Sequence, residues 1–135
     1  MPAVEIGASE LLLIIVHVKK WVTNLLRAKA KRKKESKNAL RAVIKTVRKT
    51  TIYVRNIRDG GEKSIEKEKE LSLLWTNLSF RLEDIGLEKL ARRCNFKGRY
   101  WADPASFDEE FLERAGIRLS EIESLADDSL KEITK

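Results

Sequence analysis

The sequence has a single cysteine and a single histidine, and this scarcity excludes several kinds of site. Cys94 alone supplies neither a disulfide framework nor a set of thiolates for zinc. His17 has no second His and no nearby Cys with which to bind a metal ion, so we expect a core histidine, no metal and no cofactor. Because isolated thiols are typical of reducing compartments, the sequence predicts a cytoplasmic protein.

Glycine and proline are also scarce, and neither occurs between Gly7 and Gly60. These residues usually mark turns and strand ends, so their absence predicts long helices. No run of four or more residues alternates apolar and polar side chains beside a hairpin turn, which indicates that the chain has no sheet. A length of 135 residues fits one typical domain, and we therefore expect a single helical-bundle domain over residues 1–135.

Catalytic motifs are missing as well. The sequence contains neither a phosphate-binding GxxxxGK loop nor a GxSxG nucleophile motif, and one Cys and one His far apart in the chain do not indicate a catalytic pair. Carboxylates gather at Asp108-Glu109-Glu110 and Asp127-Asp128, where helix dipoles and solubility explain them. The sequence therefore predicts no catalytic residue, no small-molecule substrate and no enzymatic activity.

The apolar run near the start of the sequence is too short to cross a membrane. Leu11 to Val18 are uncharged, but Glu10 and Lys19 enclose them, whereas a spanning helix needs roughly 20 apolar residues. Positive charges follow the run, which is the wrong order for a secretory signal. Trp21 and the following lysines suit an anionic lipid surface, so peripheral membrane association is the third interpretation of function.

The same run belongs to an expected helix from about residue 9 to residue 30. Its main apolar stripe has the spacing of three and four residues that is typical of a buried helix face. Leu12, Leu13 and Val16 widen the apolar surface beyond that stripe. A helix that is apolar over more than half of its circumference must be covered on more than one side. Either the rest of the bundle or a second chain covers them, and we predict that these three residues contact a protein partner or a second copy of the chain.

Two further helices are predicted in the middle of the sequence. The segment RAKAKRKKESKN, residues 27–38, has no large apolar side chain, and we expect a turn at 35–38. Apolar spacing then predicts a helix from Ala39 that Asp59-Gly60-Gly61 ends. The run from Ile65 to Gly86 repeats the pattern and predicts a third helix.

The C-terminal part of the sequence predicts shorter elements. Two turns of helix are expected over 87–94, with Leu90 and Ala91 inward, followed by a loop over 95–104 that contains Gly98 and a proline. Ser106 with Glu109, and Ser120 with Glu123, match the capping box, so two short helices should begin near 107 and 121. The predicted fold is all-α: three long antiparallel helices plus a short-helix C-terminal segment over 87–135.

Charge is divided unevenly along the chain. Residues 1–63 contain 16 Lys and Arg against 5 Asp and Glu, a net charge of +11, whereas residues 64–135 contain 12 against 16, a net charge of −4. Such asymmetry indicates either an acidic partner for the basic half, 1–63, or attraction between the acidic C-terminal part and the basic half. Composition does not separate these two interpretations.

Basic side chains cluster on one face of the second predicted helix. Arg41, Lys45, Arg48 and Arg55, here called the basic ridge, lie within about 80° of one another on a helical wheel. A second basic cluster, at the preceding turn, comprises Lys29, Lys31, Arg32, Lys33 and Lys34. Together they suit the phosphates of nucleic acid or another anion, but the favoured interpretation is a basic face that is only solvated or is neutralised by the acidic half.

A second candidate site lies in the sequence FKGRYWADP. Lys97 and Arg99 supply cations beside the aromatic rings of Tyr100 and Trp101, a combination that binds single-stranded nucleic acid or charged side chains of a partner. Adjacent aromatics in a loop also close one end of a bundle, and that interpretation is favoured.

The pattern as a whole predicts a small, non-enzymatic binding or accessory subunit of a larger assembly, in which protein is the main partner. Nucleic-acid binding through the basic ridge is the alternative.

Overall fold

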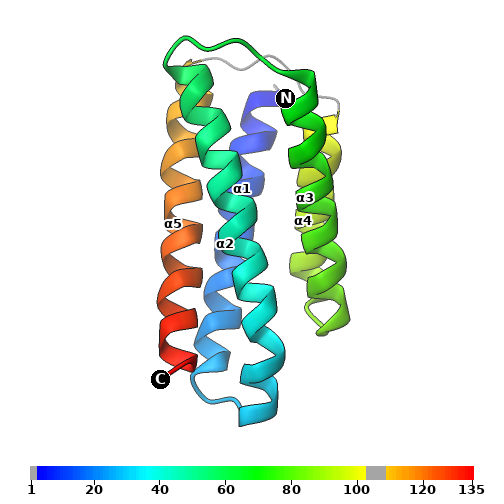
Figure 1. The fold of residues 1–135 in the computed structure, drawn as a ribbon, viewed down its shortest axis with the longest axis vertical. Helices are drawn as coiled ribbons and strands as arrows, with labels where there is room; N and C mark the ends of the chain where they lie inside the picture. The colour runs from blue at the N-terminus through cyan, green and yellow to red at the C-terminus, as the bar shows by residue number, and fades with distance from the viewer. Residues whose placement is uncertain (1–2, 103–108) are drawn as a thin grey trace.

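The computed structural model describes residues 3–102 and 109–135, with side chains described for 11–98 and 113–135. These residues form helices and no strand, which confirms the prediction of an all-α protein. Figure 1 shows five helices, whose bounds are α1 Ala3–Leu25, α2 Ala30–Arg58, α3 Ile65–Asp84, α4 Glu88–Ala102 and α5 Glu109–Ile133.

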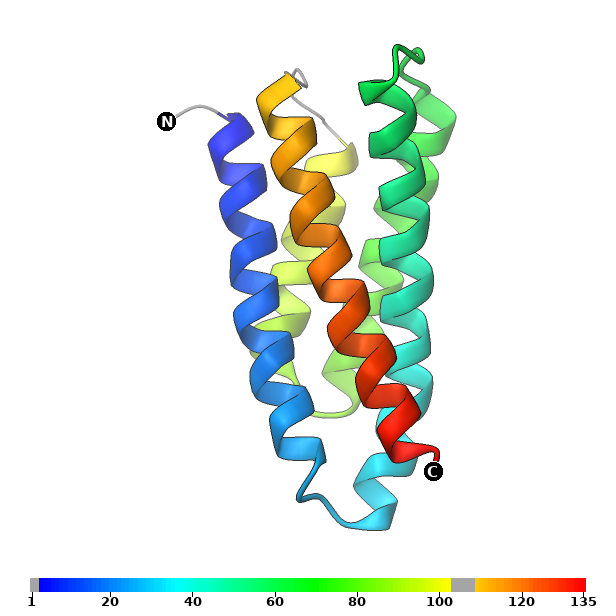
Figure 2. The ribbon, with the colours of Figure 1, turned by 90° about the vertical axis from the view of Figure 1, so that its left-hand side faces the viewer.

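The helices close into a ring. Along this ring α1 packs against α4, α4 against α3, α3 against α2, α2 against α5, and α5 against α1. Figure 2 shows that α5, the last helix of the chain, lies between α1 and α2. The acidic C-terminal part is thereby folded against the basic half of the sequence.

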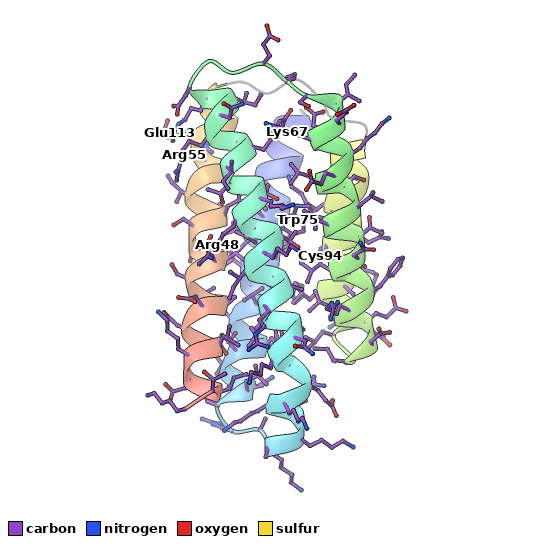
Figure 3. All side chains as sticks on the ribbon, in the orientation of Figure 1. Arg48, Arg55, Lys67, Trp75, Cys94 and Glu113 are labelled. Atoms are coloured by element: carbon purple, nitrogen blue, oxygen red, sulfur yellow. The ribbon has the colours of Figure 1, made fainter. Side chains whose placement is uncertain are left out.

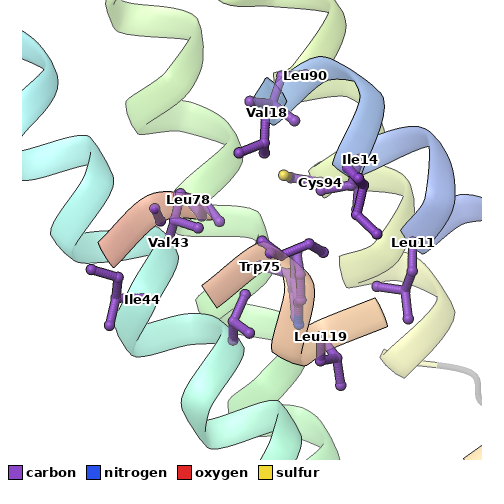
Figure 4. Close-up of a cluster of buried hydrophobic side chains, with 14 of the residues drawn as sticks. Leu11, Ile14, Val18, Val43, Ile44, Trp75, Leu78, Leu90, Cys94 and Leu119 are labelled. Atoms are coloured by element: carbon purple, nitrogen blue, oxygen red, sulfur yellow. The ribbon is translucent and has the colours of Figure 1, made fainter. Parts of the chain in front are cut away.

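The core lies inside this ring and draws on every helix (Figure 4). Leu11 of α1, Val43 of α2, Leu78 of α3, Leu90 of α4 and Leu119 of α5 are all buried in one cluster. The spacing of three and four residues along each helix places these apolar side chains on the face that points into the ring.

Among the described side chains, one of the two buried tryptophans of the core is held by a specific polar contact to a neighbouring helix. Trp75 of α3 is buried, and its indole N–H donates to the Thr50 hydroxyl of α2 over 3.0 Å. The same hydroxyl donates to the carbonyl oxygen of Thr46 over 2.8 Å. A buried indole N–H needs such an acceptor, so this pair fixes the register between α2 and α3.

Glycine ends α2 and α3 as the sequence predicts. Gly60 follows α2 with φ 94°, and Gly86 follows α3 with φ 84°. Residues with a Cβ atom are strained in this region of backbone conformation, so glycine is the favoured residue at both turns.

The first turn differs from the prediction. The chain turns over residues 26–29, and α2 already begins at Ala30, so the turn expected at 35–38 is wrong. Ser36 is buried, where its hydroxyl accepts from the indole N–H of Trp21 over 3.4 Å. The Arg32 guanidinium donates to the carbonyl oxygen of Ile85. These contacts from other helices give the charged segment a packed environment, which its lack of large apolar residues did not indicate.

The loop expected over 95–104 is also wrong up to residue 102, because α4 continues to Ala102. Residues 103 and 104 lie outside the described residues. Gly98 is buried, and an added Cβ would stand 2.6 Å from the Thr76 hydroxyl oxygen of α3. The Ser72 hydroxyl donates to the Gly98 carbonyl oxygen over 2.8 Å. Gly98 therefore permits close packing of α3 and α4 and makes no turn.

The C-terminal part forms one long helix in place of the second short one. The helix α5 passes through Ser120, which consequently caps no helix start. The reason is an apolar stripe of buried residues that continues across this position, namely Ala115, Leu119, Ile122 and Ala126. The start expected near 107, and its cap Ser106, lie outside the described residues.

Candidate functional site

The outer face of α1 carries three large apolar side chains. Leu12, Leu13 and Val16 are 44%, 39% and 55% exposed, whereas Ile14 and Ile15 between them are buried. We call the three residues the α1 apolar patch. The structure thus places the predicted partner-contact residues on the surface and outside the core.

Other exposed apolar side chains are dispersed. Among the described side chains, the remaining large ones are Leu26, Ile52, Ile65, Leu73, Phe80, Phe96 and Ile117. No two of these lie within four residues of each other in the sequence, and single exposed apolar residues are ordinary on protein surfaces. Along the sequence, the α1 apolar patch is therefore the densest group of these residues, and clustered apolar exposure is the property that marks interaction sites.

The basic ridge is exposed on α2, but α5 partly neutralises it. The Arg48 guanidinium lies 3.0 Å from the Glu123 carboxylate of α5. Arg55 borders a groove of 590 Å³ between α2 and α5 that Glu113 and Glu123 also line, and Figure 3 shows Arg48 and Arg55 on the side of α2 toward α5. Lys19 of α1 likewise lies 3.6 Å from Glu121. Attraction between the acidic and basic parts of the chain is thus realised at these contacts.

The basic cluster of residues 29–34 is not uniform. Lys29, Lys31 and Lys34 are exposed, whereas Arg32 and Lys33 are partly buried. Arg32 binds the carbonyl oxygen at the turn between α3 and α4. This residue therefore joins α2 to that turn, and its predicted role in binding phosphate is not favoured by its position.

The candidate site around Lys97 has a different setting from the predicted loop. Lys97, Arg99, Tyr100 and Trp101 all lie on α4. Lys97 is only 1% exposed, so its ammonium group does not present a surface charge. The side chains of Arg99, Tyr100 and Trp101 lie outside the described side chains.

The sequence interpretation missed a basic groove between α1 and α4. It has a volume of 710 Å³ and is lined by His17, Lys89, Arg92, Arg93, Asn95 and Phe96. An adjoining groove of 320 Å³ shares His17 and Lys89 and adds Lys20. We call the two together the α1–α4 groove. The sequence pattern that indicates it is the spacing of three or four residues that joins Lys89, Arg92, Arg93 and Phe96 on one helix face. The predicted end of this helix at residue 94 excluded Phe96 from that face.

His17 lies in this groove and is not the core histidine that the sequence predicted. Its side chain is partly exposed. Partial burial lowers the pKa of His17 below its ordinary value, and the positive charges of Arg93, Lys89 and Lys20 lower it further. The imidazole therefore senses a positive potential that arises from two helices.

Among the described residues, no three His, Cys, Asp or Glu side chains are grouped as a metal site would require. Within the same part of the chain, no helix has the length and apolar character needed to span a bilayer. Comparison of the chain with protein-family models, with curated proteins and with solved structures finds no match.

Proposed function

We propose that this chain is a non-catalytic helical binding subunit that docks onto a protein partner through the α1 apolar patch. The observation that carries the proposal is the exposure of Leu12, Leu13 and Val16 within five residues of one helix. Contiguous exposed apolar surface on a folded protein typically marks a contact with another protein.

The expected energetics support a docking role for this patch. Complete burial of a large aliphatic side chain contributes about 1.5 to 3 kcal/mol, so covering the exposed fractions of three such residues gives a substantial driving force. Lys19 and Lys20 follow the patch on the same helix and are exposed. An apolar centre with charged residues at its edge is typical of protein interfaces.

Nucleic-acid binding through the basic ridge is a weaker alternative, because the Arg48–Glu123 salt bridge and the nearby Glu113 reduce its positive potential. Peripheral membrane association through α1 is the third proposal. It is the weakest of the three, because the indole of Trp21 is buried and cannot insert into a lipid surface.

The test is a capture experiment with purified bait from the native cell, with nuclease and high-salt arms. The patch variant is Leu12→Ser/Leu13→Gln/Val16→Ser, and the matched control is Ile52→Ser/Leu73→Gln/Ile117→Ser, which removes three exposed apolar residues elsewhere. We expect the wild type and the control to capture the same protein in every arm and the patch variant to lose it. Light scattering after size exclusion shows whether that protein is a second copy.

Far-ultraviolet circular dichroism and thermal unfolding of the patch variant complete the test. An intact fold is expected, since surface substitutions usually change stability by about 0.5 kcal/mol or less. Equal capture by the patch variant, or its loss of fold, would overturn the proposal.

A further inference from the structure

We infer that the α1–α4 groove binds a single strand of nucleic acid, with phosphates at Lys20, Lys89 and Arg92 and a base stacked on Phe96. This site is separate from the basic ridge of α2 and does not depend on the α1 apolar patch.

The cations of the groove come from two helices, and Lys89 lies where its two parts adjoin. Lys20 projects from α1, and Lys89 and Arg92 project from α4. None of the three forms a salt bridge with a carboxylate of the described side chains, in contrast to Arg48 on the basic ridge. Glu88 is the only acidic residue among the described residues that line the groove. The positive charges of Lys20, Lys89 and Arg92 are thus not offset by a carboxylate at salt-bridge distance among the described side chains.

Phe96 adds a stacking surface to these charges. Its side chain is 44% exposed at the wall of the groove, four residues after Arg92 on the same helix. An exposed ring beside cations is the combination by which proteins bind single strands without sequence preference, because every base has a π face and every nucleotide has a phosphate. Asn95 adds an amide next to the ring, which can form hydrogen bonds with a base or a sugar.

The exposed ring of Phe96 favours a single strand over a duplex. The residues of the site line a groove between two neighbouring helices, where an extended strand can contact both walls. A duplex keeps its bases stacked inside, so it would offer its phosphates to the cations but no free base face to Phe96.

The charges around His17 agree with this geometry. Burial lowers the pKa of this imidazole, and the positive charges of Arg93, Lys89 and Lys20 lower it further, so these cations lie near one point of the groove. A phosphate group placed there would be attracted to all of them.

The test is fluorescence anisotropy with a labelled oligo(dT) of about 12 nucleotides, a length within the range of sites that bind single strands. The groove variant is Lys89→Gln/Arg92→Gln, and the charge-matched control is Lys67→Gln/Lys69→Gln on α3. Both lose two positive charges from exposed positions. We expect the groove variant to bind at least tenfold more weakly and to flatten the plot of log affinity against log salt by about 1.4, which is 0.7 for each lost phosphate contact.

A second variant separates stacking from charge. Phe96→Ala should weaken binding by about fivefold to a hundredfold, as expected for the loss of one stacked base, and should leave the salt dependence unchanged. Thermal unfolding of each variant shows whether the fold is retained, so that a loss of binding is assigned to the groove.

Three results would overturn the inference. The first is no binding by the wild type at about 150 mM salt. The second is an equal loss in the groove variant and in the charge-matched control, which would indicate attraction to the overall charge of +7. The third is binding of a duplex of the same length as tight as that of the single strand.

Discussion

The hydroxyl of Tyr53 on α2 donates a hydrogen bond to the carboxylate of Glu68 on α3, and both residues are buried. The same hydroxyl oxygen accepts from the backbone N–H of Ser64 over 3.2 Å. Ser64 is the N-cap of α3, where its own hydroxyl accepts from the Lys67 N–H. Tyr53 therefore joins the last turns of α2 to the start of α3 and fixes the path of the chain between them.

Removing this hydroxyl should destabilise the fold. Tyr53→Phe leaves the Glu68 carboxylate buried without its donor, which costs about 1 to 3 kcal/mol. Urea unfolding monitored by circular dichroism measures the change. In the double variant Tyr53→Phe/Glu68→Met both polar groups are replaced, so we expect it to be more stable than Tyr53→Phe alone. A Tyr53→Phe protein as stable as the wild type would contradict the prediction.

The same pair predicts a loss of stability at alkaline pH. Burial, followed by the hydrogen bond to Glu68, raises the pKa of Tyr53 to about 12 from 10.0. Since the folded state holds the proton more tightly, this contribution is intact below pH 10 and is lost as the pH rises through the folded pKa. The full loss is on the order of 2 kcal/mol. Unfolding at a series of alkaline pH values should show a steeper decline for the wild type than for Tyr53→Phe.

The close approach of α3 and α4 at Gly98 gives a test of the packing. In Gly98→Ala the new Cβ would lie 2.6 Å from the Thr76 hydroxyl oxygen and 3.1 Å from the Ser72 carbonyl oxygen. Overpacking of this kind costs about 1 to 3 kcal/mol, which exceeds the gain of about 1 kcal/mol in helix propensity. Thr76→Ala/Gly98→Ala should recover part of the loss in thermal unfolding. A Gly98→Ala protein with a higher melting temperature than the wild type would show that α3 and α4 move apart at little cost in free energy.

His17 predicts a dependence of stability on mildly acidic pH. Its pKa is lowered in the folded state by burial and by Arg93, Lys89 and Lys20, so the unfolded chain binds the proton more readily. Stability should therefore fall as the pH drops through 6.5, the pKa expected for the unfolded state, and level off below the folded pKa. Because His17 is the only histidine, one imidazole resonance reports its titration by NMR.

A variant identifies the cause of that shift. Lys89→Gln removes one of the three cations that face His17, so the pKa of the imidazole should rise toward its ordinary value. Lys131→Gln, at an exposed position on α5 that plays no part in this shift, is the control and should leave the titration unchanged. Coincident titration curves for the wild type and Lys89→Gln would show that the charge of Lys89 does not act on His17.

The periodicity of apolar residues was sufficient to predict an all-α fold and the helix α3, because a stripe with a spacing of three and four residues is stable only when one helix face is buried. The glycines at positions 60 and 86 predicted where α2 and α3 end, since a positive φ favours a residue without a Cβ atom. The same periodicity placed Leu12, Leu13 and Val16 beyond the main apolar stripe of α1, and these residues are exposed.

Contacts between distant segments decided the rest. Residues 30–38 are helical where Ser36 meets Trp21 and Arg32 meets Ile85, and neither contact has a local signal in the sequence. The local motifs at Gly98 and Ser120 resemble a turn and a helix cap, but burial against neighbouring helices overrides them. The α1–α4 groove requires His17 and Lys89 to be neighbours although 71 other residues separate them along the chain, and only the closed ring of helices brings their charges together.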